Sequence, residues 1–319
     1  MNGAPFHTMN DRSSHPDPSV ARGVTERAWG YLFATPALLL LLVLAVAPIQ
    51  AAIWLGFQRH LPIFQVSEFV GLDNYLLLMG DERFWAACRT TLYFTGISVG
   101  AELALGLGLA LILHRLAEDT GRGGLSLQVI ILIPWVIPTV VSAEMWDWLY
   151  QADSGLLNYL LLSSGVIRTP INWLEHPAWA LHAAILMDVW KTTPFAALLL
   201  LAGLKAIPRE LYLAARVDGA GRWAMLRRIT LPLLLPVMLI VLVFRTMDAV
   251  RAFDAIFVLT GGGPGNSTET LSIYAYKMLF QTLQFGYGSA LATTMFLAAL
   301  AITSGYLSLL RRHLKEVAR

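Results

Sequence analysis

Long apolar blocks separated by shorter polar segments dominate the pattern of this chain. The six blocks cover residues 28–58, 90–113, 125–149, 177–204, 231–259 and 285–310. A helix needs about 20 apolar residues to cross the hydrocarbon core of a bilayer, and every block reaches that length. Pro134 and Pro138 interrupt the third block, where a kink is tolerable if neighbouring helices satisfy the freed carbonyl groups. The pattern predicts six transmembrane helices.

One polar segment, residues 205–232, stands between two of these blocks and reads KAIPRELYLAARVDGAGRWAMLRRITLP. Pro208 is a favoured residue at a helix start, and Glu210 falls in the first turn, near the positive end of the helix dipole. Leu211 and Ala214 give this helix a small apolar face. Asp218 and Gly219 end it, because glycine relaxes the backbone at a turn. The segment has the form of a docking element, and the alternative is a plain connecting loop.

Composition supports a membrane protein over a soluble one. Hydrophobic residues make up 56% of the chain, charged residues only 14%, and the mean hydropathy is +0.60. A soluble domain carries roughly 25% charged residues, so a chain of this composition has too much apolar surface for one globule. The single cysteine, Cys88, excludes an internal disulfide and a cysteine-based metal cluster. We therefore predict an all-α membrane protein.

The distribution of cations predicts the orientation. Residues 1–27 are polar and aperiodic and read as a disordered tail, residues 28–313 as the six-helix transmembrane domain, and residues 314–319 as a C-terminal tail. Residues 1–27, 114–124, 205–228 and 311–319 carry fifteen Lys or Arg residues, whereas the three opposite loops carry about five. Cytoplasmic loops are enriched in Lys and Arg, so we predict a multi-pass protein of the inner (plasma) membrane with both termini in the cytoplasm.

Charged residues inside the apolar blocks are the candidates for a polar path through the membrane. The fifth block carries Arg245, Asp248, Arg251 and Asp254, one every three residues. That spacing allows Arg245 to pair with Asp248, and Arg251 with Asp254, along one helix. Ionisable residues at this depth usually face a bundle interior or a water-filled cavity. The alternative is a set of self-neutralising pairs that lock helix to helix.

Further candidates lie in the third and fourth blocks. They are Asp188, Lys191 and Trp146. Aromatic faces stack on sugar rings, while carboxylate and guanidinium groups bind hydroxyl groups, so the mixture suits a neutral polyhydroxylated ligand. For Trp146, an interfacial aromatic belt is the competing interpretation. Glu102, alone in its block, is better interpreted as a helix-to-helix hydrogen-bonding residue than as a ligand site.

Several motifs are missing from the sequence. It contains no GxxxxGK[ST] phosphate loop, so the chain itself is not expected to bind ATP in the usual way. It also contains no HExxH or CxxC motif and no nucleophile–base spacing, which argues against a membrane enzyme. The GGGPG run at 261–265 is interpreted as a loop at a helix end rather than a nucleotide cradle.

The segment AARVDGAGRWAMLRRITLP resembles the EAA signature of permease subunits in binding-protein-dependent ABC importers. The matching residues are Ala214, Ala215, Asp218, Gly219, Ala220, Ile229, Leu231 and Pro232. WKTTPF, LAGLKAIP and FDAIFVLTGGGPGNSTETL resemble the carbohydrate branch, of the maltose and glycerol-phosphate permease type. FRTMDAVRAFDAIFVLTGG is especially similar to mycobacterial trehalose permease subunits. The resemblance implies the type I ABC importer permease fold, with residues 205–232 as its coupling segment.

The resemblance also implies partners and a set of coupling residues. The expected partners are a second permease, two ATPase subunits that bind the ATP and Mg²⁺, an external sugar-binding protein and the lipid bilayer, with no nucleic acid and no cofactor of the chain's own. The residues expected to couple to an ATPase are Glu210, Leu213, Ala214, Ala215, Asp218, Gly219 and Ala220. Leu213 stands where the signature has its ATPase-contacting glutamate, so that contact is either lost or made by Glu210. The rival hypothesis is a proton-coupled secondary transporter that uses Asp188, Lys191 and the charges at 245–254.

Overall fold

The computed structural model describes residues 18–120 and 123–317, and almost all of its secondary structure is helical. Residues up to Ala52 and residues Ile53–Arg319 form two separate units, and each is considered by itself. The helices are α1 (Pro18–Leu41), η1 (Leu42–Val46), α2 (Ala47–Gly56), η2 (Pro62–Phe64), α3 (Asp73–Gly80), α4 (Glu82–Thr120), α5 (Gly123–Val136), α6 (Thr139–Tyr150), α7 (Leu156–Ser163), α8 (Pro177–Lys205), α9 (Arg209–Val217), α10 (Arg222–Met225), η3 (Leu226–Thr230), α11 (Leu231–Val250), α12 (Asp254–Thr260), α13 (Leu271–Tyr276), η4 (Lys277–Gln281) and α14 (Phe285–Val317). The two strands are β1 (Gln58–Leu61) and β2 (Val66–Phe69).

The first apolar block forms a helix from α1 through α2, and its apolar stretch Tyr31–Gly56 is long enough to cross a membrane. No residue in its most apolar 18-residue window is buried within the chain, so those side chains are available to lipid. The helix begins at Pro18, and residues 18–27, which we expected in the disordered tail, are therefore helical. Proline is well tolerated in a first helical turn, which explains the earlier start. Residues 1–17 of the expected tail lie outside the described residues.

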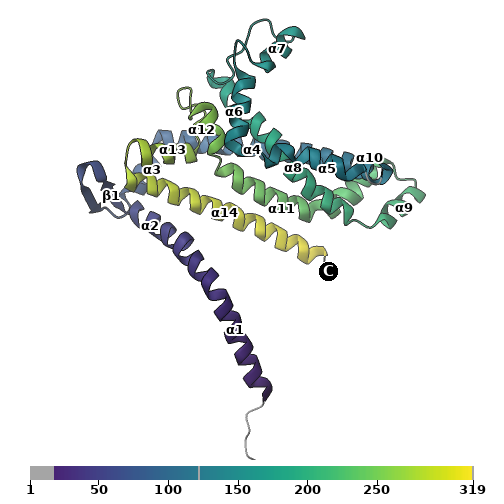
Figure 1. Ribbon diagram of the computed structural model, residues 1–319, viewed down its shortest axis with the longest axis horizontal. Helices are drawn as coiled ribbons and strands as arrows, with labels where there is room; N and C mark the ends of the chain where they lie inside the picture. The colour runs from purple at the N-terminus through teal and green to yellow at the C-terminus, as the bar shows by residue number, and fades with distance from the viewer. Residues whose placement is uncertain (1–17, 121–122, 318–319) are drawn as a thin grey trace, which may run out of the picture. The chain divides into compact units, whose positions relative to one another are not determined.

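In the second unit, α8 is the central helix. Two thirds of its most apolar window is buried, whereas a third or less of the corresponding windows of α4, α11 and α14 is buried. It packs along α4 and is also in contact with α5 and α11, and Figure 1 shows these helices running together, with α14 beside α11. Ala196, Leu200 and Leu204 of α8 lie in a buried cluster with side chains of α4 and α11. These contacts place three predicted spans around one another.

Close approach between helices occurs at glycines. A Cβ atom added to Gly106 of α4 would lie 3.0 Å from the Cβ atom of Ala196 in α8. One added to Gly203 of α8 would lie 2.7 Å from the Leu234 side chain of α11. In lipid, such small residues let helices gain van der Waals contact where no hydrophobic effect drives association. The glycines of α4 therefore serve packing at Gly106, and within the described chain no other segment approaches Gly96, Gly100 or Gly108 to 4 Å.

Two of the predicted spans are broken more sharply than the sequence indicated. The third consists of α5 and α6, which meet at an angle of 90°. The break falls at Pro138, the residue before α6, because proline disfavours helical backbone in the residue that precedes it. The fifth ends as α11 at Val250, and α12 follows after residues 251–253. The described residues thus contain five helices long enough to span a membrane, and a sixth span if the bent pair counts as one.

The region between the first two spans contains an element that the sequence analysis missed. Strands β1 and β2 pair antiparallel, with Gln58 opposite Phe69 and Leu61 opposite Val66. The strands have only four residues each, too few for an alternating pattern to stand out. A turn follows the strands, where Gly71 has φ +60° and α3 begins at Asp73. Phe84 and Trp85 lie in the first turn of α4.

An ion cluster fastens the loop before α13 to the start of α4. Glu269, buried, accepts two hydrogen bonds from the Arg83 guanidinium, at 2.7 and 2.8 Å, and pairs with Lys277 Nζ at 2.8 Å. Burial alone would raise the pKa of Glu269, but the hydrogen bonds from Arg83 and Lys277 outweigh it and hold that pKa below its ordinary value. The carboxylate therefore stays charged at neutral pH and holds the two segments together.

A second carboxylate at the same end is held by tyrosines. Asp81 accepts hydrogen bonds from the hydroxyl groups of Tyr274 and Tyr287. Burial opposes the charge of Asp81, yet these bonds and a backbone N–H bond from Arg83 lower its pKa. Burial and the bond to Asp81 in turn raise the pKa of Tyr274 to about 12, so Tyr274 stays a donor. The start of α4, α13 and α14 are thus joined at one point.

At its other end α14 continues to Val317, into the stretch that we expected to be a C-terminal tail. Residues 318–319 of that tail lie outside the described part of the chain.

Candidate functional site

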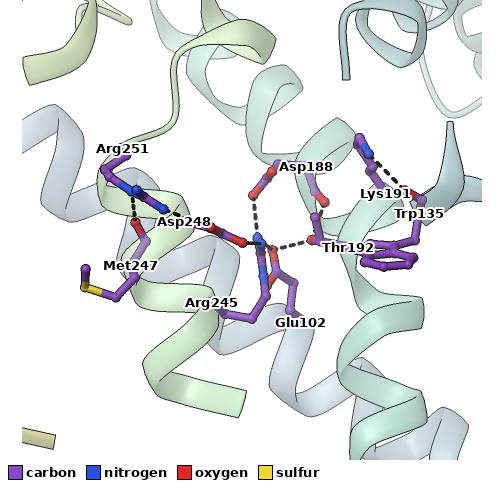
Figure 2. Close-up of polar contacts among 9 residues, drawn as sticks. All are labelled: Glu102, Trp135, Asp188, Lys191, Thr192, Arg245, Met247, Asp248 and Arg251. Atoms are coloured by element: carbon purple, nitrogen blue, oxygen red, sulfur yellow. Dashed lines mark hydrogen bonds and ion pairs between the residues drawn. The ribbon is translucent and has the colours of Figure 1, made fainter. Parts of the chain in front are cut away.

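The strongest polar interaction inside the helix bundle joins Glu102 of α4 to Arg245 of α11. The Arg245 guanidinium donates through Nε to Oε2 and through Nη2 to Oε1, the latter at 2.8 Å (Figure 2). Glu102 is fully buried and the Arg245 side chain is 6% exposed. A bidentate pair of this kind fixes orientation as well as distance, because both groups are planar. It therefore sets the position of α11 on α4.

Helix α8 joins the same cluster through two residues. The Thr192 hydroxyl lies 2.7 Å from Glu102 Oε1, and Asp188 Oδ2 accepts from Arg245 Nη2 at 3.3 Å. Three helices therefore share one guanidinium–carboxylate pair. Glu102 was predicted to be a helix-to-helix hydrogen-bonding residue, and the structure confirms this. What the sequence did not reveal is its partner, since Arg245 lies 143 positions away.

Two further charged residues at the end of α11 extend the cluster towards the surface of the chain. Asp248 Oδ2 lies 3.3 Å from Arg245 Nη1, and Asp248 Oδ1 lies 3.3 Å from Arg251 Nη2. The side chains of Asp248 and Arg251 are 59% and 63% exposed, in contrast to the buried pair beneath them. The predicted pairing of Arg245 with Asp248 is confirmed. The chain thus presents a row of alternating charges that runs from a buried position to an open one.

The predicted pairing of Arg251 with Asp254 is wrong. Arg251 lies against Asp248 and the Met247 carbonyl oxygen, 3.0 Å from its Nε. Asp254 begins the separate helix α12 and is exposed. The break at residues 251–253 removes the i,i+3 relation on which the prediction depended. Asp254 in the first turn of α12 instead lies near the positive end of that helix.

Lys191, a further candidate, points away from the carboxylates towards the bend in the third span. Its Nζ donates to the Trp135 carbonyl oxygen at 3.2 Å, near the end of α5 (Figure 2). The Trp135 ring stacks on Phe195 of α8, with centroids 5.4 Å apart. Where a helix ends inside a membrane, its last carbonyl groups need partners. Lys191 supplies one, and it thereby ties the bend to α8.

Trp146 lies in an aromatic cluster. Its ring is 5.3 Å from that of Tyr150 and 5.6 Å from that of Trp190, and it packs against a buried core. Its role in a polar path stays a prediction. Trp148, its neighbour, is 77% exposed, as an interfacial tryptophan would be.

The predicted surface helix is present as α9, between α8 and α11. It begins after Pro208, carries Glu210 in its first turn and ends at Val217. Gly219 has φ +78°, its N–H donates to the Arg216 carbonyl, and the Ala220 N–H donates to the Ala215 carbonyl at 2.8 Å. This is a Schellman motif, which requires the left-handed backbone that glycine adopts without strain. The sequence prediction of a helix ended at Asp218 and Gly219 is confirmed.

The residues of α9 divide between two faces. Arg209, Tyr212, Leu213 and Arg216 line a cavity on the side of α4 and α10. Tyr212 is anchored there, since its hydroxyl lies 3.0 Å from Thr230 Oγ1. Leu211, Ala214 and Val217 lie outside this lining and are exposed, Val217 by 88%. α9 therefore presents a free surface of small and apolar residues, flanked by Glu210 and Asp218.

Comparison with known proteins shows which family the chain belongs to. Residues 104–315 match the family described as the binding-protein-dependent transport system inner membrane component. The chain belongs to this family. It is therefore a permease subunit of an ABC transport system and a multi-pass membrane protein. Such subunits are not enzymes, because the ATPase of the system is a separate subunit.

Relatives of this permease cover nearly its whole length. The trehalose/maltose transport system permease protein MalF of Thermococcus litoralis is 43% identical over 88% of this chain and 93% of its own. The trehalose transport system permease protein SugA of Mycobacterium tuberculosis is 38% identical over 86% of this chain and 85% of its own. A crystal structure of a bacterial importer of the acidic polysaccharide alginate has the same fold, with a TM-score of 0.79 at 24% identity over 92% of this chain and 99% of that one. The type I importer permease fold predicted from the sequence is confirmed.

The buried pair in the permease leads to a stability prediction. We expect Arg245→Met to destabilise the purified permease by about 3–5 kcal/mol, because it leaves Glu102 charged, buried and unpaired. The double variant Glu102→Gln/Arg245→Met should regain much of that loss, since a neutral amide then replaces the fully buried carboxylate of Glu102. Arg251→Met is the matched control and should cost under about 1 kcal/mol, because Arg251 is exposed.

The measurement is unfolding, in one detergent, of five proteins: the unaltered permease, Arg245→Met, Glu102→Gln, the double variant and Arg251→Met. Simple additivity of the Arg245→Met and Glu102→Gln effects in the double variant would show that the pair is not coupled.

Proposed function

We propose that this permease forms half of the translocation path of an ATP-driven sugar importer and receives the motion of an ATPase subunit through α9. The observation that carries the proposal is the geometry of α9. It is short, it connects two membrane-length helices directly, and its free face is small and apolar. A short helix with such a face is suited to a groove on a partner protein. The cation distribution supports a cytoplasmic position for it.

The partners in this proposal follow from the family. They are a second permease, two ATPase subunits that bind ATP and Mg²⁺, and an external sugar-binding protein. The family description itself refers to binding-protein-dependent transport. A structural relative, the alginate transporter, has been crystallised in complex with an alginate pentasaccharide-bound periplasmic protein. Closure of the ATPases would move α9, and the helices on either side of it would carry that motion to a site within the membrane.

Glu210 is a candidate to replace the signature glutamate that this chain lacks. Leu213, at that position, is half exposed and lines the cavity beside α9. Glu210, one turn earlier, is exposed and does not line that cavity. We propose that Glu210 makes the charged contact to the ATPase and that Leu213 contributes apolar area.

The substrate class is proposed from the relatives and from the open end of the charge cluster. Two relatives are named as trehalose or trehalose/maltose permeases, and a third, from Agrobacterium fabrum, as a sulfoquinovosyl glycerol permease. Asp248 and Arg251 are exposed and close together, so they can accept from and donate to the hydroxyl groups of a sugar. We propose that Asp248 and Arg251, which we call the rim of the charge cluster, contact the sugar as it passes.

The role of α9 is tested at Gly219. Gly219→Val forces a β-branched residue into left-handed backbone, at a strain of roughly 1–2 kcal/mol, and should misplace the end of α9. We expect ATP-dependent sugar uptake into vesicles that contain the complete importer to fall about tenfold, because 1.4 kcal/mol is a factor of ten. Nothing lies within 4 Å of the Cβ position, so the chain should still fold and insert.

Gly219→Asn is the matched control, because asparagine tolerates this backbone, and it should retain most of the uptake. Full uptake by Gly219→Val would contradict the coupling role. Uptake driven by a proton gradient, without ATP or any ATPase subunit, would favour the secondary transporter instead.

The role of the rim is tested by removing its charges. Arg251→Ala and Asp248→Ala should each reduce sugar uptake at least about fivefold while the amount of assembled importer stays unchanged, since both side chains are exposed and stabilise little. Arg168→Ala, an exposed arginine in the loop before α8, serves as the control. Normal uptake in both rim variants would show that these charges are structural only.

A further inference from the structure

A cavity of about 570 Å³ lies beside α9, where several helices end. Its walls come from the last turns of α4 and α8, from α9 and α10, and from η3. Four arginines line it: Arg115 of α4, Arg209 and Arg216 of α9, and Arg222 of α10. Segments far apart in the sequence therefore place arginine side chains around one cavity.

No described acidic side chain compensates the charge of this cavity. Its lining contains no aspartate and no glutamate. Among the side chains that the structure describes, no carboxylate lies at ion-pairing distance from any of the four guanidinium groups. This differs from Arg83 and Arg245, each of which is paired with a buried glutamate. Four unpaired cations around one cavity repel one another, and an anion placed among them would remove that repulsion.

Apart from His114 and Thr230, the remaining walls are apolar and aromatic. Leu111, Leu204 and Leu226 line the cavity next to the arginines. Trp223 lies at its rim with 73% of its surface exposed, and tryptophan favours the interface between membrane and water. α4, α8 and the helix that continues from α10 into α11 are membrane-length, so the cavity lies at the end of the membrane-spanning part of each. It combines a cationic end with an apolar surface at membrane depth.

We propose that this cavity binds the phosphate group of an anionic phospholipid of the inner leaflet. Guanidinium groups bind phosphate oxygens in pairs, and basic pockets between membrane helices at the cytoplasmic side suit acidic headgroups. The choice of a lipid as the source of the phosphate rests on the proposed function, because that proposal places α9 at the cytoplasmic surface. The pocket itself is a property of the chain alone.

Such a lipid would link α9 to the body of the permease. Arg209 and Arg216 belong to α9, whereas Arg115 and Arg222 lie outside it. The direct polar tether of α9 to the helices beneath it is the hydrogen bond between Tyr212 and Thr230. A phosphate held by arginines of both groups adds a second tether. The headgroup would then set how firmly motion of α9 is transmitted.

The test measures lipid retention by the purified full-length permease, without ATP and without partners. The protein is reconstituted in phosphatidylcholine nanodiscs that contain 10–30% phosphatidylglycerol, on the order used for an anionic leaflet, and bound phosphatidylglycerol is quantified by native mass spectrometry. Arg115→Gln/Arg222→Gln removes two pocket charges outside α9. Arg227→Gln/Arg228→Gln removes two exposed charges of η3 that do not line the pocket, and is the matched control.

We expect the pocket variant to retain about tenfold less phosphatidylglycerol than the unaltered protein, given the attraction of each cation to an anionic headgroup. The control should retain nearly as much as the unaltered protein. Equal loss in both variants, or no loss in either, would overturn the proposal. A second arm uses inorganic phosphate with pure phosphatidylcholine discs. Binding that depends on the pocket there, without lipid retention, would support the phosphate site and assign it a soluble source.

A third arm separates the lipid from a docking role. Binding of the ATPase subunits to the same variants is measured in detergent free of anionic lipid. If the pocket variant retains lipid normally but loses ATPase binding, the arginines serve docking and the lipid proposal is wrong. If sugar uptake proves independent of ATP while lipid retention still depends on the pocket, the proposed function fails and the lipid site stands.

Discussion

The bidentate pair of Glu102 with Arg245 is the interaction on which the arrangement of this permease depends. In a bilayer, helices gain little from burying apolar side chains against one another, because lipid is equally apolar. A charged pair excluded from lipid is different, since either partner alone would cost several kcal/mol. Because Thr192 and Asp188 bind the same pair, α4, α8 and α11 meet at one point. The same three helices also pack closely at Gly106 and Gly203.

This cluster determines how a movement of α9 would be transmitted through the helices on either side of it. α9 follows α8 directly and precedes the helix that becomes α11, and both of those helices are tied at Arg245. At ~1.5 Å per residue, Asp188 lies roughly 25 Å along α8 from its end at Lys205, and Arg245 lies roughly 20 Å along α11 from its start. A displacement of α9 therefore acts on two arms that are joined again at the charge cluster. The same displacement reaches Asp248 and Arg251, which extend the cluster outward.

Much of this could be predicted from the sequence, where local rules decide. The length of the apolar blocks was enough to predict the spans. Pro208, Glu210 and Gly219 were enough to predict α9, because helix capping and turn formation depend on neighbouring residues. Partners separated by long stretches of chain were beyond such rules. Glu102 was recognised as a residue that bonds another helix, but no spacing indicates Arg245. Arg251 was paired with Asp254 on the assumption of a continuous helix, whereas α11 ends at Val250 and α12 begins at Asp254. The cavity of arginines joins α4 to α9 and α10, and the sequence offers only a general excess of cations there.

The central claim is that α8 and α11 move as one unit because the charge cluster clamps them. It is tested by the distance between spin labels at Leu186 on α8 and Phe244 on α11, both exposed, in the complete importer with Cys88 replaced by alanine. The clamp predicts one narrow distance distribution, identical with and without ATP, that broadens in Arg245→Met. A distribution that shifts between the two nucleotide states in the otherwise unaltered permease would contradict it.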